Sequence, residues 1–219
     1  MVLIAVHGAA ARFLPAERGT LALGLALEHA DREVVVRDVA ALHERLVADA
    51  KSFVHRGAAT WWGSDQVRVH SVRRYRKDSE VADVVQAAAA EVRVKFRDFG
   101  ALSDWVEQAG SLEGVTVADI DWTVTEAHRT QVQREVRVQA VRDATQRAEA
   151  YAAAIGAESV ELQALWEPGL RPGADSHAGG GFTTRAMLSA SGSSGFELRP
   201  DDIEIAAEVT ADFLVRLPA

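Results

Sequence analysis

The sequence predicts an α+β protein with a largely antiparallel sheet and two long helices packed on one face of it. Two segments, 31–57 and 130–155, place apolar residues at helical spacing, whereas the segments around them alternate between apolar and polar residues as strands do. The spacings between neighbouring strands are those of hairpins, which join antiparallel strands. With 48% hydrophobic residues among 219, the chain can bury a core. We therefore expect a single domain over residues 1–219.

The expected order is strand, strand, helix, strand, strand, helix, strand, helix, strand, strand (ββαββαβαββ). The predicted strands are residues 2–6, 20–28, 66–75, 84–96, 115–125, 160–166 and 202–215. Asp31 is a suitable N-cap for the first helix, which should end at Gly57, and Asp98 is suitable for the second. The third helix has capping-box spacing at Thr130 and Gln133 and should end at Gly156.

A long Gly/Ser-rich loop, residues 168–200, separates the last two predicted strands. Thirty irregular residues are uncommon in a compact domain unless they serve a function, are disordered or fold on a partner. The glycines and serines resemble a flexible linker, but Phe182 and Phe196 do not, because linkers seldom carry large apolar groups. The loop is therefore a candidate contact segment or lid.

Composition excludes some functions and limits others. The absence of cysteine excludes disulfides, thiolate metal sites and cysteine nucleophiles. A net charge of −8 argues against nucleic acid as a partner. No apolar stretch reaches the roughly 18 residues of a membrane span, and the N-terminus has no basic leader, so the chain as given is expected to be cytoplasmic.

No catalytic or metal site is predicted. The seven histidines lack the spacing of metal ligands, and the nucleophile-elbow and phosphate-loop patterns are absent. We therefore expect neither enzyme activity nor a cofactor.

Two kinds of contact residue are predicted instead. The segment His70–Lys77 and the alternating Arg93, Lys95 and Arg97 form two basic strands, whose default interpretation is a solvated face paired with acidic groups. The alternative is anion binding by Arg73, Arg93 and Arg185. Trp61 and Trp62 lie between alanine and glycine residues in an expected loop, where one exposed indole would mark an interface.

Three segments together resemble the SIMPL domain family, a widespread bacterial family that includes periplasmic immunogenic proteins. Residues 4–28 are similar to the family's opening strands, and residues 138–169 to its alanine-rich helix, glycine stop and strand. Residues 198–215 resemble its closing Pro-x-x-Ile-x-Ile-x-Ala-x-Val strand. The chain departs from the family in lacking an export leader and in having Ala59–Gly63 where many members have a short polar stretch.

The resemblance implies no catalytic residues. It implies a usual location in the periplasm, an association with envelope or oxidative stress, and ring-like homo-oligomers in some members. The first hypothesis is thus a non-enzymatic bacterial protein that acts through homo-oligomer assembly or protein–protein contact, with Trp61, Trp62, Phe182 and Phe196 as contact residues. The alternative is a small-molecule or anion-binding protein that uses residues 168–200 as a lid.

Overall fold

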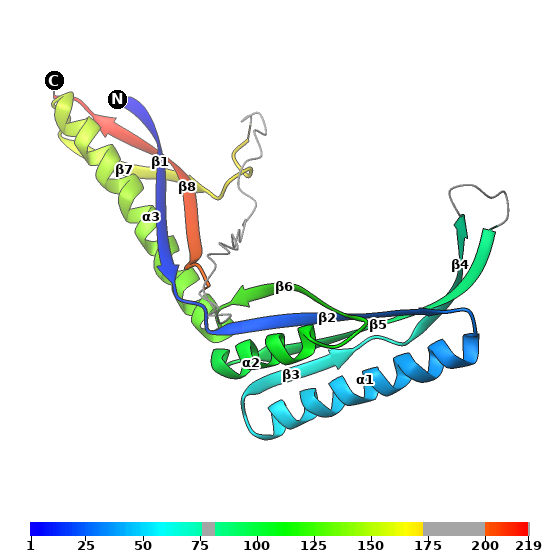
Figure 1. The fold of residues 1–219 in the computed structure, drawn as a ribbon. Coiled ribbons are helices and arrows are strands. Elements are labelled where there is room, and N and C mark those ends of the chain that lie inside the picture. The colour runs from blue at the N-terminus through cyan, green and yellow to red at the C-terminus, as the bar shows by residue number, and fades with distance from the viewer. Residues whose placement is uncertain (76–81, 173–199, 219) are drawn as a thin grey trace. The chain divides into compact units, whose positions relative to one another are not determined.

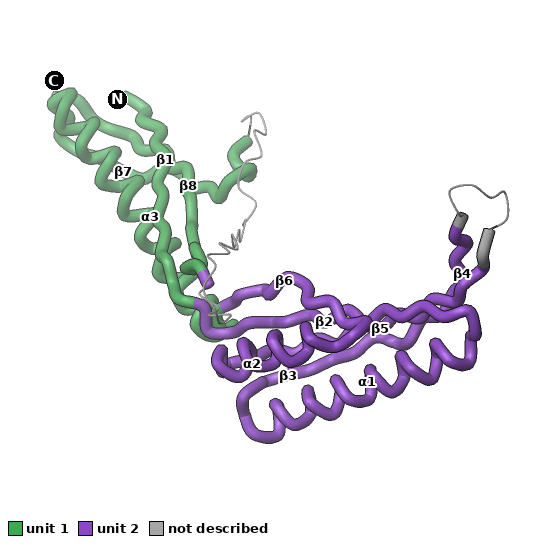
Figure 2. Tube along the Cα trace, in the orientation of Figure 1, with its two compact units in different colours: residues 1–15, 124–187, 201–219 green, residues 16–123, 188–200 purple. Residues whose placement is uncertain are grey.

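The computed structural model describes residues 1–75, 82–172 and 200–218. The chain divides into two compact units (Figure 2). Unit 1 comprises residues 1–15, 124–187 and 201–219, and unit 2 comprises residues 16–123 and 188–200. Each unit contains its own sheet, and the α+β class predicted from the sequence is confirmed because every pairing between described strands is antiparallel.

Unit 1 is a three-stranded sheet with a single long helix. Its elements are β1 (Val2–Leu14), α3 (Glu126–Ala154), β7 (Ser159–Trp166) and β8 (Ile203–Arg216). The strand order is β1-β8-β7, and α3 lies along one face of the sheet (Figure 1). Helix residues four apart share one stripe, and here the stripe is mostly alanine: Val132, Val136, Ala140, Ala144, Ala148 and Ala152 are buried.

The helix approaches β1 closely enough to require a glycine. A Cβ added to Gly8 would overlap the carbonyl oxygen of Ala140 and lie 2.7 Å from the Cβ of Ala144. The small core of unit 1 is completed by Val6, Val209, Ala211 and Phe213 on the strands. The alanine stripe of α3 together with Gly8 thus lets this helix lie close to its sheet.

Unit 2 is a five-stranded sheet with two helices. Its elements are β2 (Arg18–His29), α1 (Arg32–His55), β3 (Ala59–Ser64), β4 (Arg68–Tyr75), β5 (Ala82–Phe96), α2 (Phe99–Gly110) and β6 (Val115–Thr123). The order is β3-β5-β2-β6, and β4 pairs with the half of β5 that β3 leaves free. Both helices lie on the same face (Figure 1), where Phe96 of β5 contacts Phe53 of α1 and Trp105 of α2.

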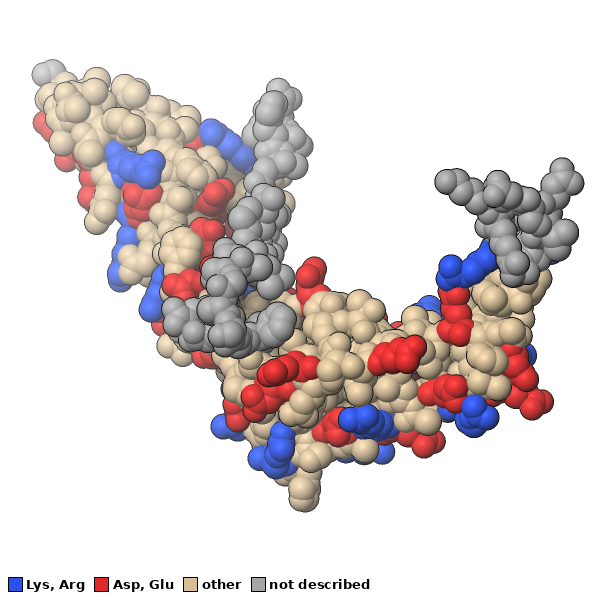
Figure 3. Space-filling view, viewed as in Figure 1, with Lys and Arg blue, Asp and Glu red and all other residues tan. Residues whose placement is uncertain are grey.

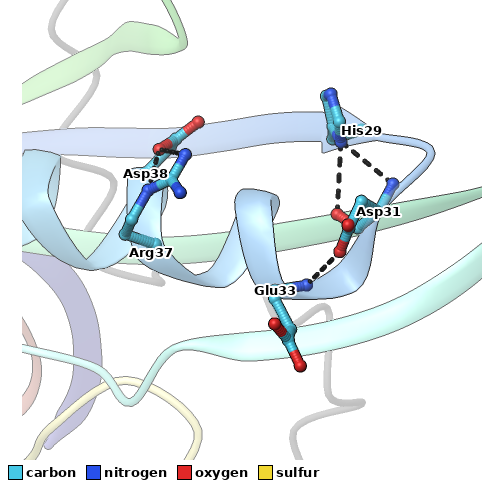
Figure 4. A network of polar contacts seen from close by, with 5 residues as sticks. All are labelled: His29, Asp31, Glu33, Arg37 and Asp38. Atoms are coloured by element: carbon cyan, nitrogen blue, oxygen red, sulfur yellow. Dashed lines mark hydrogen bonds and ion pairs between the residues drawn. The ribbon is translucent and has the colours of Figure 1, made fainter.

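The helix ends follow the predicted capping residues in two of three cases. The carboxylate of Asp31 accepts from the backbone N–H of Glu33, and the N–H of Asp31 donates to Nδ1 of His29 (Figure 4). Asp98 likewise accepts from the N–H of Ala101. Gly57 and Gly156 follow their helices with φ of 75° and 69°, a conformation that residues with a Cβ rarely adopt.

Three details differ from the prediction. The helix α3 has Thr125 as its N-cap, so Thr130 and Gln133 lie inside the helix and form no capping box. The strands form two sheets instead of one, with one long helix on each. Residues 59–64, expected to be a loop, are the additional strand β3, because their backbone pairs with residues 92–96 of β5. No helix within the described residues is long and apolar enough to cross a membrane.

Candidate functional site

The two basic strands do not bring Arg73 and Arg93 together. Arg73 lies opposite Val84 on β5, whereas Arg93 itself lies on β5 opposite Gly63 of β3. The two positions thus lie nine steps apart along β5, which corresponds to about 30 Å at the rise of a strand. An odd number of steps places the two side chains on opposite faces of the sheet. Arg185, the third predicted anion contact, lies outside the described residues.

The charge of Arg93 is balanced locally. Its Nε lies 3.0 Å from Oε1 of Glu91, and its Nη2 lies 3.4 Å from Oδ1 of Asp65. Arg74 similarly pairs with Glu28 at 2.5 Å. In the space-filling view, basic and acidic side chains alternate and form no single basic field (Figure 3). For Arg74 and Arg93, these contacts match the default interpretation of a solvated face paired with acidic groups.

The two adjacent tryptophans of β3 face opposite sides of the sheet. Trp62 lies opposite buried Val94, on the side of α1, and the Nζ of Lys51 lies 5.6 Å from its ring centroid. Trp61 lies opposite Lys95 on the other face and is 47% exposed. Its ring occupies the space that a Cβ on Gly63 would fill. Trp61 is thus an available contact residue, whereas Phe182 and Phe196 lie outside the described residues.

Exposed apolar side chains are concentrated in unit 1. Of the fourteen large apolar residues that are exposed within the described ranges, eleven belong to this unit. They are Met1, Val2, Leu3, Phe13, Val138, Tyr151, Ile155, Leu162, Leu165, Leu170 and Leu217. Only Val36, Trp61 and Val84 of the described part of unit 2 share this property. Apolar residues that adjoin one another on a surface mark contact sites, so the elements of unit 1 that carry these residues are candidates for contact.

The helix-free face of the three-stranded sheet carries part of this exposure. Leu3 and Phe13 of β1, 60% and 63% exposed, have the strand parity opposite to Val6, which packs under α3. Leu214 of β8 pairs with Leu3 and is half-buried. Apolar side chains therefore lie at both ends of this face.

The free edge of β1 is occupied by side chains of α3. The N–H of Ala9 donates to Oδ2 of Asp143 at 3.0 Å, and Arg12 pairs with Glu135 at 2.5 Å. The hydrogen bond from Ala9, together with Arg147, holds the pKa of Asp143 below its ordinary value. An edge whose amide is already bonded is a poor template for another strand.

A buried ion pair lies on the same helix-free face and was not anticipated from the sequence. Asp212 is the only buried charged residue in the described part of the chain, 7% exposed, between Ala211 and Phe213, which pack toward α3. Nη2 of Arg171 donates to both its carboxylate oxygens at 2.9 and 3.0 Å. The Arg171 guanidinium lies 5.2 Å from the Trp166 ring centroid.

The sequence alone gives little indication of the Arg171–Asp212 ion pair. An aspartate within an apolar closing strand is a visible signal, but its alternation with Glu208 and Thr210 is typical of a solvated face. Arg171 lies 41 residues away in the Pro/Gly-rich segment, and strand pairing alone does not specify that contact. The pair holds the chain that follows β7 against β8, which is a structural role.

Unit 2 contains a groove between its two helices. A cavity of about 240 Å³ is lined by Asp49, Ser52 and Phe53 of α1, by Arg56 at its C-cap, and by Asp104, Trp105 and Gln108 of α2. No cluster of three or more metal-ligating side chains occurs among the residues with described positions. The described site residues thus offer contact surfaces and a small polar cavity.

The fold defines a class of α+β protein with two antiparallel sheets. One sheet carries a single helix on one face, and the other carries two. The family model for SIMPL, described as a protein of unknown function (DUF541), matches residues 4–213. The chain therefore belongs to the SIMPL family, and the resemblance seen in its sequence is confirmed. No curated protein matches the chain significantly.

Proposed function

We propose that this SIMPL protein is non-enzymatic and acts through homo-oligomer assembly or protein–protein contact, with unit 1 as the contact unit. The observation that carries the proposal is the concentration of exposed apolar residues in unit 1, eleven of the fourteen described. Isolated exposed apolar residues are ordinary, whereas neighbouring ones on a single face favour association.

The helix-free face of the three-stranded sheet is the part of unit 1 best suited to this role. Leu3 and Phe13 lie at its two ends, and the small side chains of Ala5, Ala9 and Ala11 lie between them along the same face of β1, together with the exposed His7. A sheet face with apolar ends can pack against another sheet face. Pairing through the edge of β1 is less favourable, because Asp143 already accepts from the Ala9 N–H.

Size-exclusion chromatography with light scattering tests the proposal. The wild-type chain should have a mass above that of one protomer, and the double substitution Leu3→Glu, Phe13→Glu should lower that mass, because a charge buried in an apolar contact is costly. Val36→Glu, on an exposed apolar residue of unit 2, is the matched control and should leave the mass unchanged. A wild-type chain that is strictly monomeric and captures no partner in pulldown would contradict the proposal.

We also propose a role in envelope or oxidative stress and a periplasmic location. Both follow from the family resemblance alone. Comparing protein abundance with and without peroxide or envelope stress tests the first. Fractionation of the source cells tests the second, and recovery with cytoplasmic markers would favour the location expected from the sequence alone.

The alternative, binding of a small molecule or anion under residues 168–200, remains a prediction. Its support is reduced because Arg73 and Arg93 lie far apart and Arg93 already has acidic partners. A thermal-shift screen with phosphate, nucleotides and carboxylates tests it. A rise in the melting temperature that Arg73→Gln or Arg185→Gln abolishes would favour this alternative.

A further inference from the structure

The three-stranded sheet of unit 1 has two edges that differ from each other. The strand order β1-β8-β7 places β1 at one edge and β7 at the other. At the β1 edge, the N–H of Ala9 donates to Asp143, and Arg12 pairs with Glu135. Among the described residues, no strand pairs with β7 on its side away from β8. The outward N–H and C=O groups of β7 are therefore a template for another strand.

Two leucines of β7 lie beyond the cover of α3. Leu162 pairs with Phe213 and Leu165 with Ala211, and both partners belong to the core that packs under α3. Paired residues of neighbouring strands point to the same side of a sheet, so both leucines point to the α3 side. The helix contacts β1 and β8 extensively and β7 only slightly, and the two leucines are 51% and 44% exposed. They form an apolar ledge along the open edge.

An extra residue in β7 directs both leucines to the ledge. The pairing with β8 shifts its register between Leu162 and Ala164, so Gln163 has no partner of its own. Side chains three residues apart on a regular strand point to opposite faces, whereas a bulge between them turns both to one face. The bulge thus gives the edge a second large apolar side chain.

The charge of β7 is compatible with a second copy of the same strand. Glu161 is the only charged residue of Ser159–Trp166, and its Oε1 lies 3.8 Å from Nη2 of Arg216 in the same protomer. Like charges directly opposite each other destabilise a strand pair, whereas apolar pairs stabilise it. In an antiparallel pair centred near Gln163, the two Glu161 side chains lie on opposite sides of the centre, and the leucines of the two copies lie close together.

One open edge for each copy also sets the stoichiometry. Two copies that pair through β7 about a two-fold axis use both open edges, and their three-stranded sheets become one sheet of six strands. The outer strands of that sheet are the two copies of β1, where Asp143 occupies the Ala9 N–H. A third copy has no open edge to extend, so edge pairing stops at two.

We propose that β7 pairs with β7 of a second copy, antiparallel and about a two-fold axis, to form a closed dimer. The second strand would satisfy the outward backbone groups of the first, and Leu162 and Leu165 of both copies would cover one another. A second copy is the occupant that brings a matching leucine ledge on the α3 side. The inference rests on the proposed function in requiring homo-oligomer assembly, but it uses a different surface from the face that carries Leu3 and Phe13.

The absence of native cysteine permits a crosslinking test on the full chain. In an antiparallel two-fold pair, only residues near the axis lie opposite their own copies. Gln163→Cys should therefore form a disulfide-linked dimer under mild oxidation. Glu167→Cys, just beyond the end of β7, and Gln146→Cys on α3 are also at exposed positions. Both should crosslink at least about tenfold more slowly, because their copies lie farther apart than a disulfide spans.

Matched substitutions at exposed apolar residues locate the contact. Leu162→Lys should slow the Gln163→Cys crosslink about tenfold, because it places lysines of both copies within the leucine ledge. Val138→Lys on α3 is the matched control, since Val138 is also 51% exposed, and it should leave the crosslink unchanged. Leu3→Glu, Phe13→Glu should leave it unchanged too, because both residues lie on β1. Circular dichroism confirms that each variant is folded.

Light scattering adds a test of stoichiometry. A two-fold pair as the building block predicts a wild-type mass equal to an even number of protomers. An odd number would overturn the proposal. So would a Gln163→Cys variant that crosslinks no faster than Glu167→Cys or Gln146→Cys, or a Leu162→Lys substitution without effect on the crosslink.

The failure of this inference is distinguishable from that of the proposed function. A homo-oligomer whose mass falls with Leu3→Glu, Phe13→Glu but that shows no preferential Gln163→Cys crosslink would overturn the β7 pair alone. A preferential Gln163→Cys crosslink in a chain whose mass ignores the Leu3 and Phe13 substitutions would support the β7 pair and contradict the role of the helix-free face.

Discussion

The two units of this chain each cover one face of an antiparallel sheet with helices, but they do so with side chains of different size. Unit 2 covers one face of a five-stranded sheet with two helices and fills the interface with leucine and aromatic residues. Unit 1 covers a three-stranded sheet with a single helix whose buried stripe is mostly alanine. Large side chains keep helix and sheet apart and bury much area, whereas alanine and glycine permit close approach but bury little. Unit 1 consequently leaves more of its large apolar side chains exposed.

The largest expected effect is on the free energy of unfolding. It is the difference between replacing a buried phenylalanine of unit 2 and replacing an exposed one of unit 1. Phe53→Ala should lower the free energy of unfolding by about 3–5 kcal/mol, because it removes the ring between Phe96 and Trp105 and leaves a cavity. Phe13→Ala, at a 63% exposed position, should cost far less. Urea unfolding measures both. Equal effects would contradict the assignment of the large-residue core to unit 2.

The next effect concerns close packing in unit 1. Gly8→Ala should destabilise by roughly 1–3 kcal/mol, because the new methyl group meets Ala140 and Ala144 of α3. Gly24→Ala on β2 is the matched control, since its nearest neighbour, the carbonyl oxygen of Thr116, lies 3.8 Å from the added atom. Thermal unfolding followed by circular dichroism should show a lower Tm for the first variant only. A tolerated Gly8→Ala would mean that α3 is less tightly held than the distances indicate.

A smaller effect distinguishes the buried ion pair from an exposed one in the same unit. Arg171→Gln should cost about 1–3 kcal/mol, because it leaves the carboxylate of Asp212 buried with its charged partner removed. Arg216→Gln breaks the exposed pair with Glu161, at 3.8 Å, and should cost about 0–1 kcal/mol. Urea midpoints compare the two. If both variants lose the same stability, the pair with Asp212 has no special role.

The smallest effect concerns pH and the edge of β1. The pKa of Asp143 is lowered in the folded chain, first by the Ala9 hydrogen bond, so its ionised form stabilises the fold above the ordinary value of 3.8. This contribution disappears as the pH falls through the lower folded pKa. The stability difference between wild type and Asp143→Asn should therefore be present at neutral pH and vanish in acid. A stability difference of the same size at neutral pH and in acid would contradict this role of Asp143.

Helix ends could be predicted from the sequence where a single residue type meets a requirement of the neighbouring backbone. Asp31 and Asp98 cap their helices, and Gly57 and Gly156 adopt positive φ after theirs, because these requirements involve only neighbouring residues. The capping box at Thr130 was wrong because its spacing recurs by chance inside a helix. Strand β3 was missed because adjacent tryptophans flanked by glycine have no alternation that indicates a strand.

The candidate sites were harder to predict because they depend on long-range contacts. The two basic strands pair with each other, yet the register places Arg73 of β4 opposite Val84, far along β5 from Arg93. The groove residues are separated by some fifty positions between α1 and α2, and nothing in either helix indicates which face meets the other. Periodicity identifies an apolar face, but it does not identify which element covers it.

By itself, the sequence determined the α+β class, the family and most helix ends, because hydrophobic period and backbone preference act over a few residues. Only the tertiary structure decided that the strands form two sheets, that Asp143 protects the edge of β1, and that Trp105 and Arg56 share a cavity. Those outcomes depend on register and on contacts between segments distant in the chain. Such contacts are selected by the free energy of the whole packed unit and not by any local pattern.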